Sequence, residues 1–177
     1  STHGSAVAVV ADATPVLSVK VSASVPTGAT AVGEFAFSDR LGAIPEISKA
    51  AAERSGFKGK PGSTLVISNG DRVRVVCGLG SHADVGAAEL VTAVAAFTRA
   101  VSRHRKAAIE LPELGLAETR VASVLAEAAM LANYSYVQLR SDDDVAPRLN
   151  SLTIAAEGDL RALRAEVARS TSVAEAV

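Results

Sequence analysis

The sequence has no tryptophan, one cysteine, one methionine and only 3% aromatic residues. The single cysteine, Cys77, excludes an internal disulfide and favours a reducing compartment. No apolar run approaches the roughly 20 residues that cross a bilayer, and no basic stretch followed by an apolar core indicates a secretory signal. We therefore expect a cytoplasmic protein that is not inserted in a membrane.

The sequence also lacks an excess of either charge, because 18 Lys and Arg residues balance 19 Asp and Glu residues, for a net charge of −1. Nucleic-acid binding requires a clustered basic stripe. The densest basic run, Arg103-His104-Arg105-Lys106, lies where a helix is expected to end, and cations there complement the helix dipole. A nucleic-acid partner is not expected.

Alanine and valine dominate what is present, and the length suits one domain with a single core. Small side chains let helices approach a sheet closely. The apolar runs Thr64–Ile67 and Val73–Cys77 flank Asn69-Gly70, which predicts a hairpin with a type I′ turn. The second run ends in the glycine loop Gly78-Leu79-Gly80, and a helix is expected after it with Asp84 as its N-cap.

The remaining periodicities extend this α/β pattern. Strands are expected over 16–25 (near a sheet edge), 31–37, 107–111 and 149–156, and helices over 44–54 with Pro45 in the first turn, from 116, and from Gly158-Asp159. Tyr134–Leu139 is interpreted as a short strand or an extended connection. Core faces are assigned to Leu90, Val91, Val94, Phe97 and Val101 in one helix and to Val121, Val124, Leu125, Ala128, Leu131 and Ala132 in the next.

Strands that alternate with helices indicate a mixed, mostly parallel sheet with helices on both faces. We expect a three-layer α/β/α domain over residues 16–177, preceded by an irregular segment at residues 1–15.

The stretch Gly78-Leu79-Gly80-Ser81-His82-Ala83 partly fits a dinucleotide-binding fingerprint. That site needs a helix N-terminus directly after the loop. Here the helix is expected later, at an acidic cap that would repel a phosphate. We interpret the loop as a turn that needs glycine.

Other candidate residues lack the partners that their chemistry requires. Asp142, Asp143 and Asp144 are adjacent and without the spaced ligands of a calcium loop, so a solvated turn is expected. The three histidines, His3, His82 and His104, have no second ligand at metal-binding spacing.

Cys77 in a core strand is interpreted as a structural thiol. Glu110 and Glu113 flank Pro112 at a strand end, where α/β folds often place functional groups, but no further partner accompanies them. The residues alone predict no catalytic, cofactor-binding or metal-binding site.

Five stretches, in this order and with similar spacing, resemble the amino-terminal domain of the leucyl aminopeptidase family, also called cytosol aminopeptidases. They are Gly56–Leu65, Val75–Gly80, Glu110–Leu114, Leu125–Tyr134 and Arg148–Ile154. The resemblance covers roughly residues 16–177 and implies an α/β/α fold similar to the macro domain.

The resemblance also implies a parent metalloexopeptidase that releases N-terminal amino acids, leucine preferred, with two divalent metals (zinc, manganese or magnesium). The catalytic motifs of the family's carboxy-terminal domain are absent from this sequence, so no catalytic or metal residue is carried over and no cofactor is expected in this segment. The chain is expected to be the non-catalytic half, with the catalytic domain outside it.

The implied partners are that catalytic domain and other subunits, since in the family this domain is implicated in hexamer assembly; peptide substrate would be met only through the missing domain. The alternative is a stand-alone macro-like module that binds an ADP-ribose-type nucleotide at the loop Gly78–Gly80.

Overall fold

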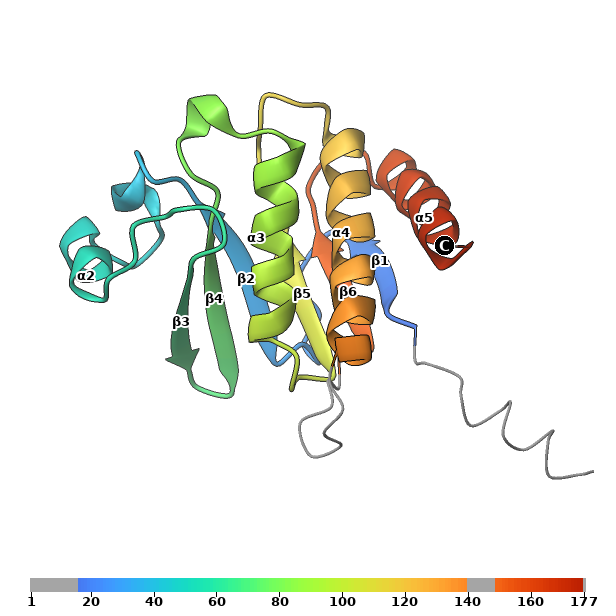
Figure 1. Cartoon of the computed structure of the whole chain (residues 1–177), viewed down its shortest axis with the longest axis horizontal. Coiled ribbons are helices and arrows are strands. Elements are labelled where there is room, and N and C mark those ends of the chain that lie inside the picture. The colour runs from blue at the N-terminus through green and yellow to red at the C-terminus, as the bar shows by residue number, and fades with distance from the viewer. Residues whose placement is uncertain (1–15, 140–148, 177) are drawn as a thin grey trace, which may run out of the picture.

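The computed structural model describes residues 16–139 and 149–176, which form one six-stranded sheet with helices packed on it (Figure 1). The strand order is β1-β6-β5-β2-β4-β3, and all neighbours are parallel except β3 and β4. The predicted mixed, mostly parallel sheet is therefore confirmed. The strands are β1 Ser18–Ser22, β2 Ala31–Ala36, β3 Thr64–Asn69, β4 Arg72–Gly78, β5 Lys106–Glu110 and β6 Ser151–Ala155.

Three long helices lie on one face of the sheet, and α4 packs between the other two (Figure 1). The helices are α2 Lys49–Arg54, α3 Ala87–Ala100, α4 Glu118–Leu139 and α5 Leu160–Ala176, with 3₁₀ turns η1 Leu41–Ala43 and η2 His82–Asp84. Within the described ranges, no helix is long and apolar enough to cross a membrane.

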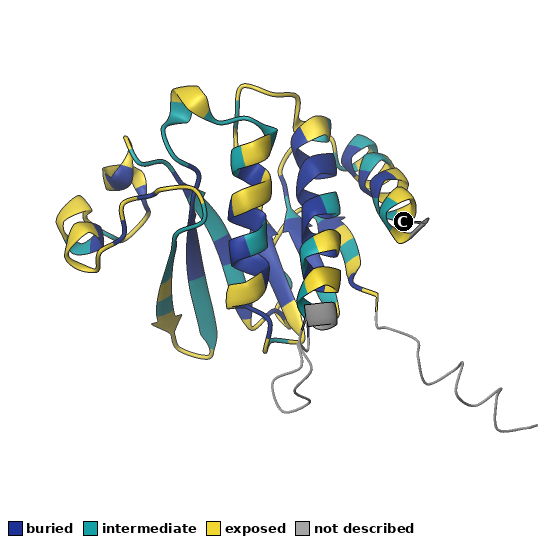
Figure 2. Ribbon diagram, in the orientation of Figure 1, coloured by how far each residue is buried: buried dark blue, intermediate teal, exposed yellow. Residues whose placement is uncertain are grey.

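The contact between α3 and the sheet depends on a glycine. Gly33 in β2 faces the ring of Phe97 in α3, and a Cβ at Gly33 would lie 2.4 Å from Phe97 Cε1. Phe97 is completely buried, and the strands behind α3 are mostly buried or half-buried (Figure 2). The helix thus approaches the strand to a distance that only a residue without a side chain permits.

The opposite face of the sheet is covered unequally. A second core cluster of Ala36, Leu41, Ile44, Ala52, Phe57 and Val76 packs at the β2–β4–β3 end. It is formed by η1, α2 and their connections. Toward β1, β6 and β5, this face instead carries exposed charged side chains, including Lys20, Lys106 and Glu110. Helical segments therefore lie on both faces, but one layer is much larger.

The hairpin between β3 and β4 forms as expected, but its predicted turn type is wrong. Asn69 pairs with Arg72, so the two-residue loop is Gly70-Asp71. Gly70 has φ 64°, and neither Asn69 nor Asp71 has a positive φ. A positive φ at the first loop position alone is typical of a type II′ turn, not type I′.

Two predicted helix starts are also wrong. Asp84 lies in η2, and α3 begins only at Ala87, where the N–H of Gly86 donates to Glu89 Oε1 at 2.8 Å. Pro45 belongs to a turn in which Glu46 has φ 65°, and α2 begins after Ser48. In both places an irregular turn comes first, because the chain must change direction before the helix can pack.

Tyr134–Leu139 is part of α4, neither a strand nor an extended connection. Two residues assigned to the core are exposed on the outer side of the helical layer: Val91 at 44% and Leu131 at 49%. Ala132 is half-buried. The other members of both predicted stripes are buried. Residues 1–15, with His3, and the acidic run Asp142–Asp144 lie outside the described residues.

Candidate functional site

The glycine loop at the carboxyl end of β4 is occupied by the chain itself. The backbone N–H groups of Gly78–Gly80 donate to the carbonyl oxygens of Ser63, Ala36 and Gly59 at 2.8 or 2.9 Å. A phosphate-binding loop needs N–H groups that are free to reach the ligand. This loop has none left, which weighs against nucleotide binding there.

Packing explains why the loop contains glycine. A Cβ at Gly78 would lie 2.2 Å from the carbonyl oxygen of Lys60. Asp39 stands beside the loop and accepts a hydrogen bond from the N–H of His82 at 3.1 Å, a bond that lowers the pKa of Asp39. The resulting carboxylate adds a negative charge that opposes an anionic ligand.

A charged cluster occupies the less covered face of the sheet. Arg74 forms a two-point ion pair with Glu34, in which Nη2 lies 3.0 Å from Oε2, and Nη2 also donates to the carbonyl of Pro45 at 2.7 Å. The hydrogen bond to Glu34 raises the pKa of Arg74. No local sequence pattern marks this pair, since its members lie 40 residues apart and meet only through strand pairing.

Glu110, one of the two acids suggested by sequence, belongs to this cluster. Partial burial of its carboxyl group, and next the negative charge of Glu34, raise the pKa of Glu110. Glu113 is exposed beyond the strand end. In the described parts of the chain, no group of three His, Cys, Asp or Glu side chains is placed to hold a metal ion. The cluster offers a proton-binding carboxyl but no adjacent nucleophile.

The thiol and the two described histidines are separated from one another. Cys77 is fully buried, and burial raises the pKa of its thiol, which keeps it protonated and unreactive. His82 follows β4 and packs edge-on against Phe37, whereas His104 precedes β5 and contacts Thr30 Oγ1 through Nδ1 at 2.9 Å. Since β4 and β5 run in the same direction, His82 lies at the carboxyl ends of the strands and His104 at their amino ends.

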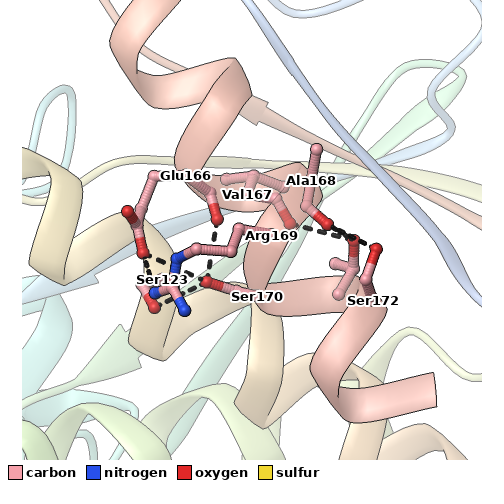
Figure 3. Close-up of polar contacts among 8 residues, drawn as sticks. Ser123, Glu166, Val167, Ala168, Arg169, Ser170 and Ser172 are labelled. Carbon is pink, nitrogen blue, oxygen red and sulfur yellow. Dashed lines mark hydrogen bonds and ion pairs between the residues drawn. The ribbon is translucent and has the colours of Figure 1, made fainter. Parts of the chain in front are cut away.

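The seam between α4 and α5 is closed by polar contacts (Figure 3). Ser123 Oγ lies 2.7 Å from Ser170 Oγ, and Ser170 Oγ lies 2.9 Å from the carbonyl of Glu166. The Glu166 carboxylate pairs with Arg169, and this bond lowers the pKa of Glu166. Both serines are buried. The hydrogen bond between the two buried hydroxyls holds the two helices together.

The seam between α3 and α4 is open by contrast. A hollow of about 500 Å³ lies there, lined mainly by apolar side chains, with charged residues among them. We call it the α3–α4 groove. Its main lining residues are Ala87, Val91, Ala95, Val124, Ala128, Leu131 and Ala132, together with Arg99, Arg120 and Glu127.

The groove explains the two misplaced core assignments, because Val91 and Leu131 line it. Tyr134, one turn beyond Leu131, is 56% exposed. The signal was present in the sequence: the apolar stripes of α3 and α4 are wider than the arc that a sheet can cover. Large exposed apolar side chains that gather in one place mark interaction surfaces.

Comparisons with known proteins give a consistent result. Residues 37–143 match a family model described as the N-terminal domain of the cytosol aminopeptidase family. Among solved structures, the bottromycin maturation enzyme BotP is 27% identical with a TM-score of 0.64, over 84% of this chain and 31% of that chain. A complex of the same enzyme with Mn is 27% identical with a TM-score of 0.63, over 84% of this chain and 30% of that chain.

A mutant of tomato leucine aminopeptidase is 17% identical with a TM-score of 0.75, over 93% of this chain and 37% of that chain, a likeness of fold. The chain thus spans about a third of the length of these structures. The search of curated proteins finds no match.

Proposed function

Because this chain belongs to the cytosol aminopeptidase family, as its N-terminal domain, we propose that it is a non-catalytic assembly or regulatory domain of a metal-dependent leucyl aminopeptidase. The family match, which covers residues 37–143, carries this proposal. In the parent enzyme, a separate domain releases N-terminal amino acids from peptides. Residues 16–177 form the domain in question.

The placement of the described side chains supports a non-catalytic role. The loop that could receive a nucleotide is filled by backbone carbonyls. The thiol is buried, and Glu34 on the open face is paired with Arg74. The most prominent surface feature is instead an apolar groove, which suits protein contact better than small-molecule turnover.

The metal and the peptide are assigned to the parent enzyme. BotP has been solved in complex with Mn, and we propose that the parent protein likewise uses two divalent ions (zinc, manganese or magnesium), all held outside this segment. Its partners are then its own catalytic domain and other subunits, a hexamer by family resemblance. We place the protein in the cytoplasm.

Hydrolysis of leucine p-nitroanilide tests the non-catalytic role. The purified chain is assayed with Mn²⁺, beside a full-length leucine aminopeptidase as positive control. We expect no turnover above the metal-only blank. Turnover that follows the chain through purification and disappears with a chelator would overturn the proposal.

A further inference from the structure

We propose that the free edge of β3 binds a short peptide with uncharged side chains, which adds to the sheet as an antiparallel strand. This site lies apart from the α3–α4 groove. It goes beyond the assembly or regulatory role proposed above, because it gives this domain a ligand that it holds without cleaving.

The backbone of β3 has hydrogen-bonding groups that no neighbouring strand uses. The N–H of Gly78 in β4 donates to the carbonyl of Ser63 at 2.9 Å. Bonded and non-bonded pairs alternate in an antiparallel ladder, so the N–H and carbonyl groups of Thr64, Val66 and Ser68 point away from β4. β3 is the last strand of the sheet (Figure 1), and in the described part of the chain no hydrogen bond reaches these groups. They are therefore available to an added strand.

The opposite edge of the sheet, at β1, is protected. There α5 packs against β1, and Arg164 Nε donates to the carbonyl of Val21 at 3.2 Å. β1 also carries Lys20, and a charged residue on an edge strand discourages pairing with another chain. The sequence of β3, TLVISN, contains neither a charged residue nor a proline. It therefore lacks these means of keeping a partner strand away.

The side chains and the length of β3 decide the kind of occupant. Val66 is 55% exposed, and Leu65 and Ile67 on the other face are half-buried beside the second core cluster. Alternate side chains of an added strand would cover both sets. The edge is only six residues long, which is too little surface for a stable pair of folded domains. It is enough for a peptide that is held mainly by main-chain hydrogen bonds.

The charges beside the two ends of β3 fit the two ends of a free peptide. An antiparallel strand would begin beside the β3–β4 turn and end beside the segment that leads into β3. Asp71 is exposed in that turn, and Lys58 and Lys60 are exposed in that segment. Arg72, the base next to Asp71, donates to the carbonyl of Pro26 instead. The peptide's ammonium group would thus meet a carboxylate and its carboxylate an ammonium group, whereas a parallel peptide would meet like charges.

Tryptophan fluorescence anisotropy tests binding, since the chain has no tryptophan of its own. The probe is the hexapeptide Thr-Val-Thr-Trp-Thr-Val with free ends, and we expect saturable one-to-one binding. Two further peptides are N-methylated, one at every Thr and the other at every Val and Trp. Because only the N–H groups on one side of the peptide meet β3, one of these should bind like the unmodified peptide and the other about tenfold more weakly or not at all.

Val66→Pro tests the place of binding, because it removes an outward N–H and leaves the ladder to β4 intact. It should weaken binding about tenfold or more. Val66→Lys, which puts a charge on the edge, should also weaken binding, whereas Val66→Thr, which keeps the N–H and the branched shape, should bind nearly normally. The matched control is Val19→Pro in β1, whose N–H likewise points away from the neighbouring strand and which should leave binding unchanged. Circular dichroism and the melting temperature verify that each variant folds.

The results that would overturn the site are specific. They are no binding of the unmodified peptide, equal affinity of the two methylated peptides, or equal effects of Val66→Pro and Val19→Pro. Self-association that Val66→Lys abolishes, in a chain that binds no peptide, would assign the edge to a second copy and would equally overturn the peptide as occupant. None of these results depends on the hydrolysis assay, so a failure here is distinct from a failure of the non-catalytic role.

Discussion

The two faces of the sheet are made from alternate residues of the same strands, yet they are stabilised differently. On the helical face, β4 contributes Val75 and Cys77 to a continuous core beneath α3, α4 and α5. On the other face, the same strand contributes Arg74, which is balanced by Glu34. The first face depends on close packing alone, whereas the second combines a smaller apolar cluster, to which β4 contributes Val76, with compensation of charge.

This difference teaches what each face can tolerate. Close packing leaves no room for an added atom, so the helical face should respond to changes in volume. Charge compensation at a partly exposed site depends on pH and on partners, so the open face should respond to changes in charge. Four predictions break or sharpen this contrast.

Gly33→Val should have the largest effect, because its side chain would enter the space of the Phe97 ring. We expect a loss of about 3 kcal/mol in the free energy of unfolding, measured by urea denaturation. Gly115→Val is the matched control, since no atom lies within 4 Å of a Cβ at Gly115. Equal losses in both variants would contradict close packing at Gly33.

Arg74→Leu should have the next largest effect, because it leaves Glu34 beside Glu110 without a positive charge. The free energy of unfolding should fall by about 2 kcal/mol at pH 7, and by less at pH 4, where carboxylates begin to protonate. Arg54→Leu, at an exposed position of α2, should be nearly neutral. A pH-independent loss would show that Arg74 acts through packing and its hydrogen bond to the carbonyl of Pro45, and not through its charge.

The serines of the α4–α5 seam should show a smaller, coupled effect. Ser123→Ala, Ser170→Ala and the double variant form a thermodynamic cycle, and we expect a coupling of about 1 kcal/mol from their shared hydrogen bond. Ser172→Ala, which removes an exposed hydroxyl bonded within its own helix, should change little. Strict additivity would mean that the contact contributes nothing.

Glu110→Gln should have the smallest effect. The pKa of Glu110 is raised in the folded state, so the folded protein binds this proton more tightly than the unfolded chain, and the contribution of Glu110 to stability falls as pH rises through that window. The variant should therefore gain slightly over the original at neutral pH and lose the gain below the ordinary carboxyl pKa. Carboxyl NMR titration of Glu110 checks the direction.

Much of the fold was predictable because local patterns repeat. Alternation identified β1 as an edge strand with one exposed side, and the apolar runs placed the β3–β4 hairpin. Helix starts were less predictable. Asp84 has the side chain of an N-cap, but the chain first forms η2 and begins α3 from Gly86. A local propensity cannot show that a turn must come first.

The candidate surfaces were hidden for a different reason. Arg74 and Glu34 meet only when β2 pairs with β4, and Gly78–Gly80 receives its carbonyl partners from two separate segments, β2 and the connection before β3. Val91 and Leu131 fit the apolar period of their helices and were assigned to the core. Only the packing of α3 beside α4 shows that they lie at the outer edge of the stripe.

By itself, the sequence determined the alternation of strands and helices and most of the buried side of each. The reason is that the period of a strand or helix fixes which residues share one of its faces. Tertiary structure alone decided that backbone carbonyls would occupy the N–H groups of the Gly78–Gly80 loop, that Arg74 would meet Glu34, and that Val91 and Leu131 would remain in contact with water. Those outcomes depend on contacts between distant segments, and no local pattern contains them.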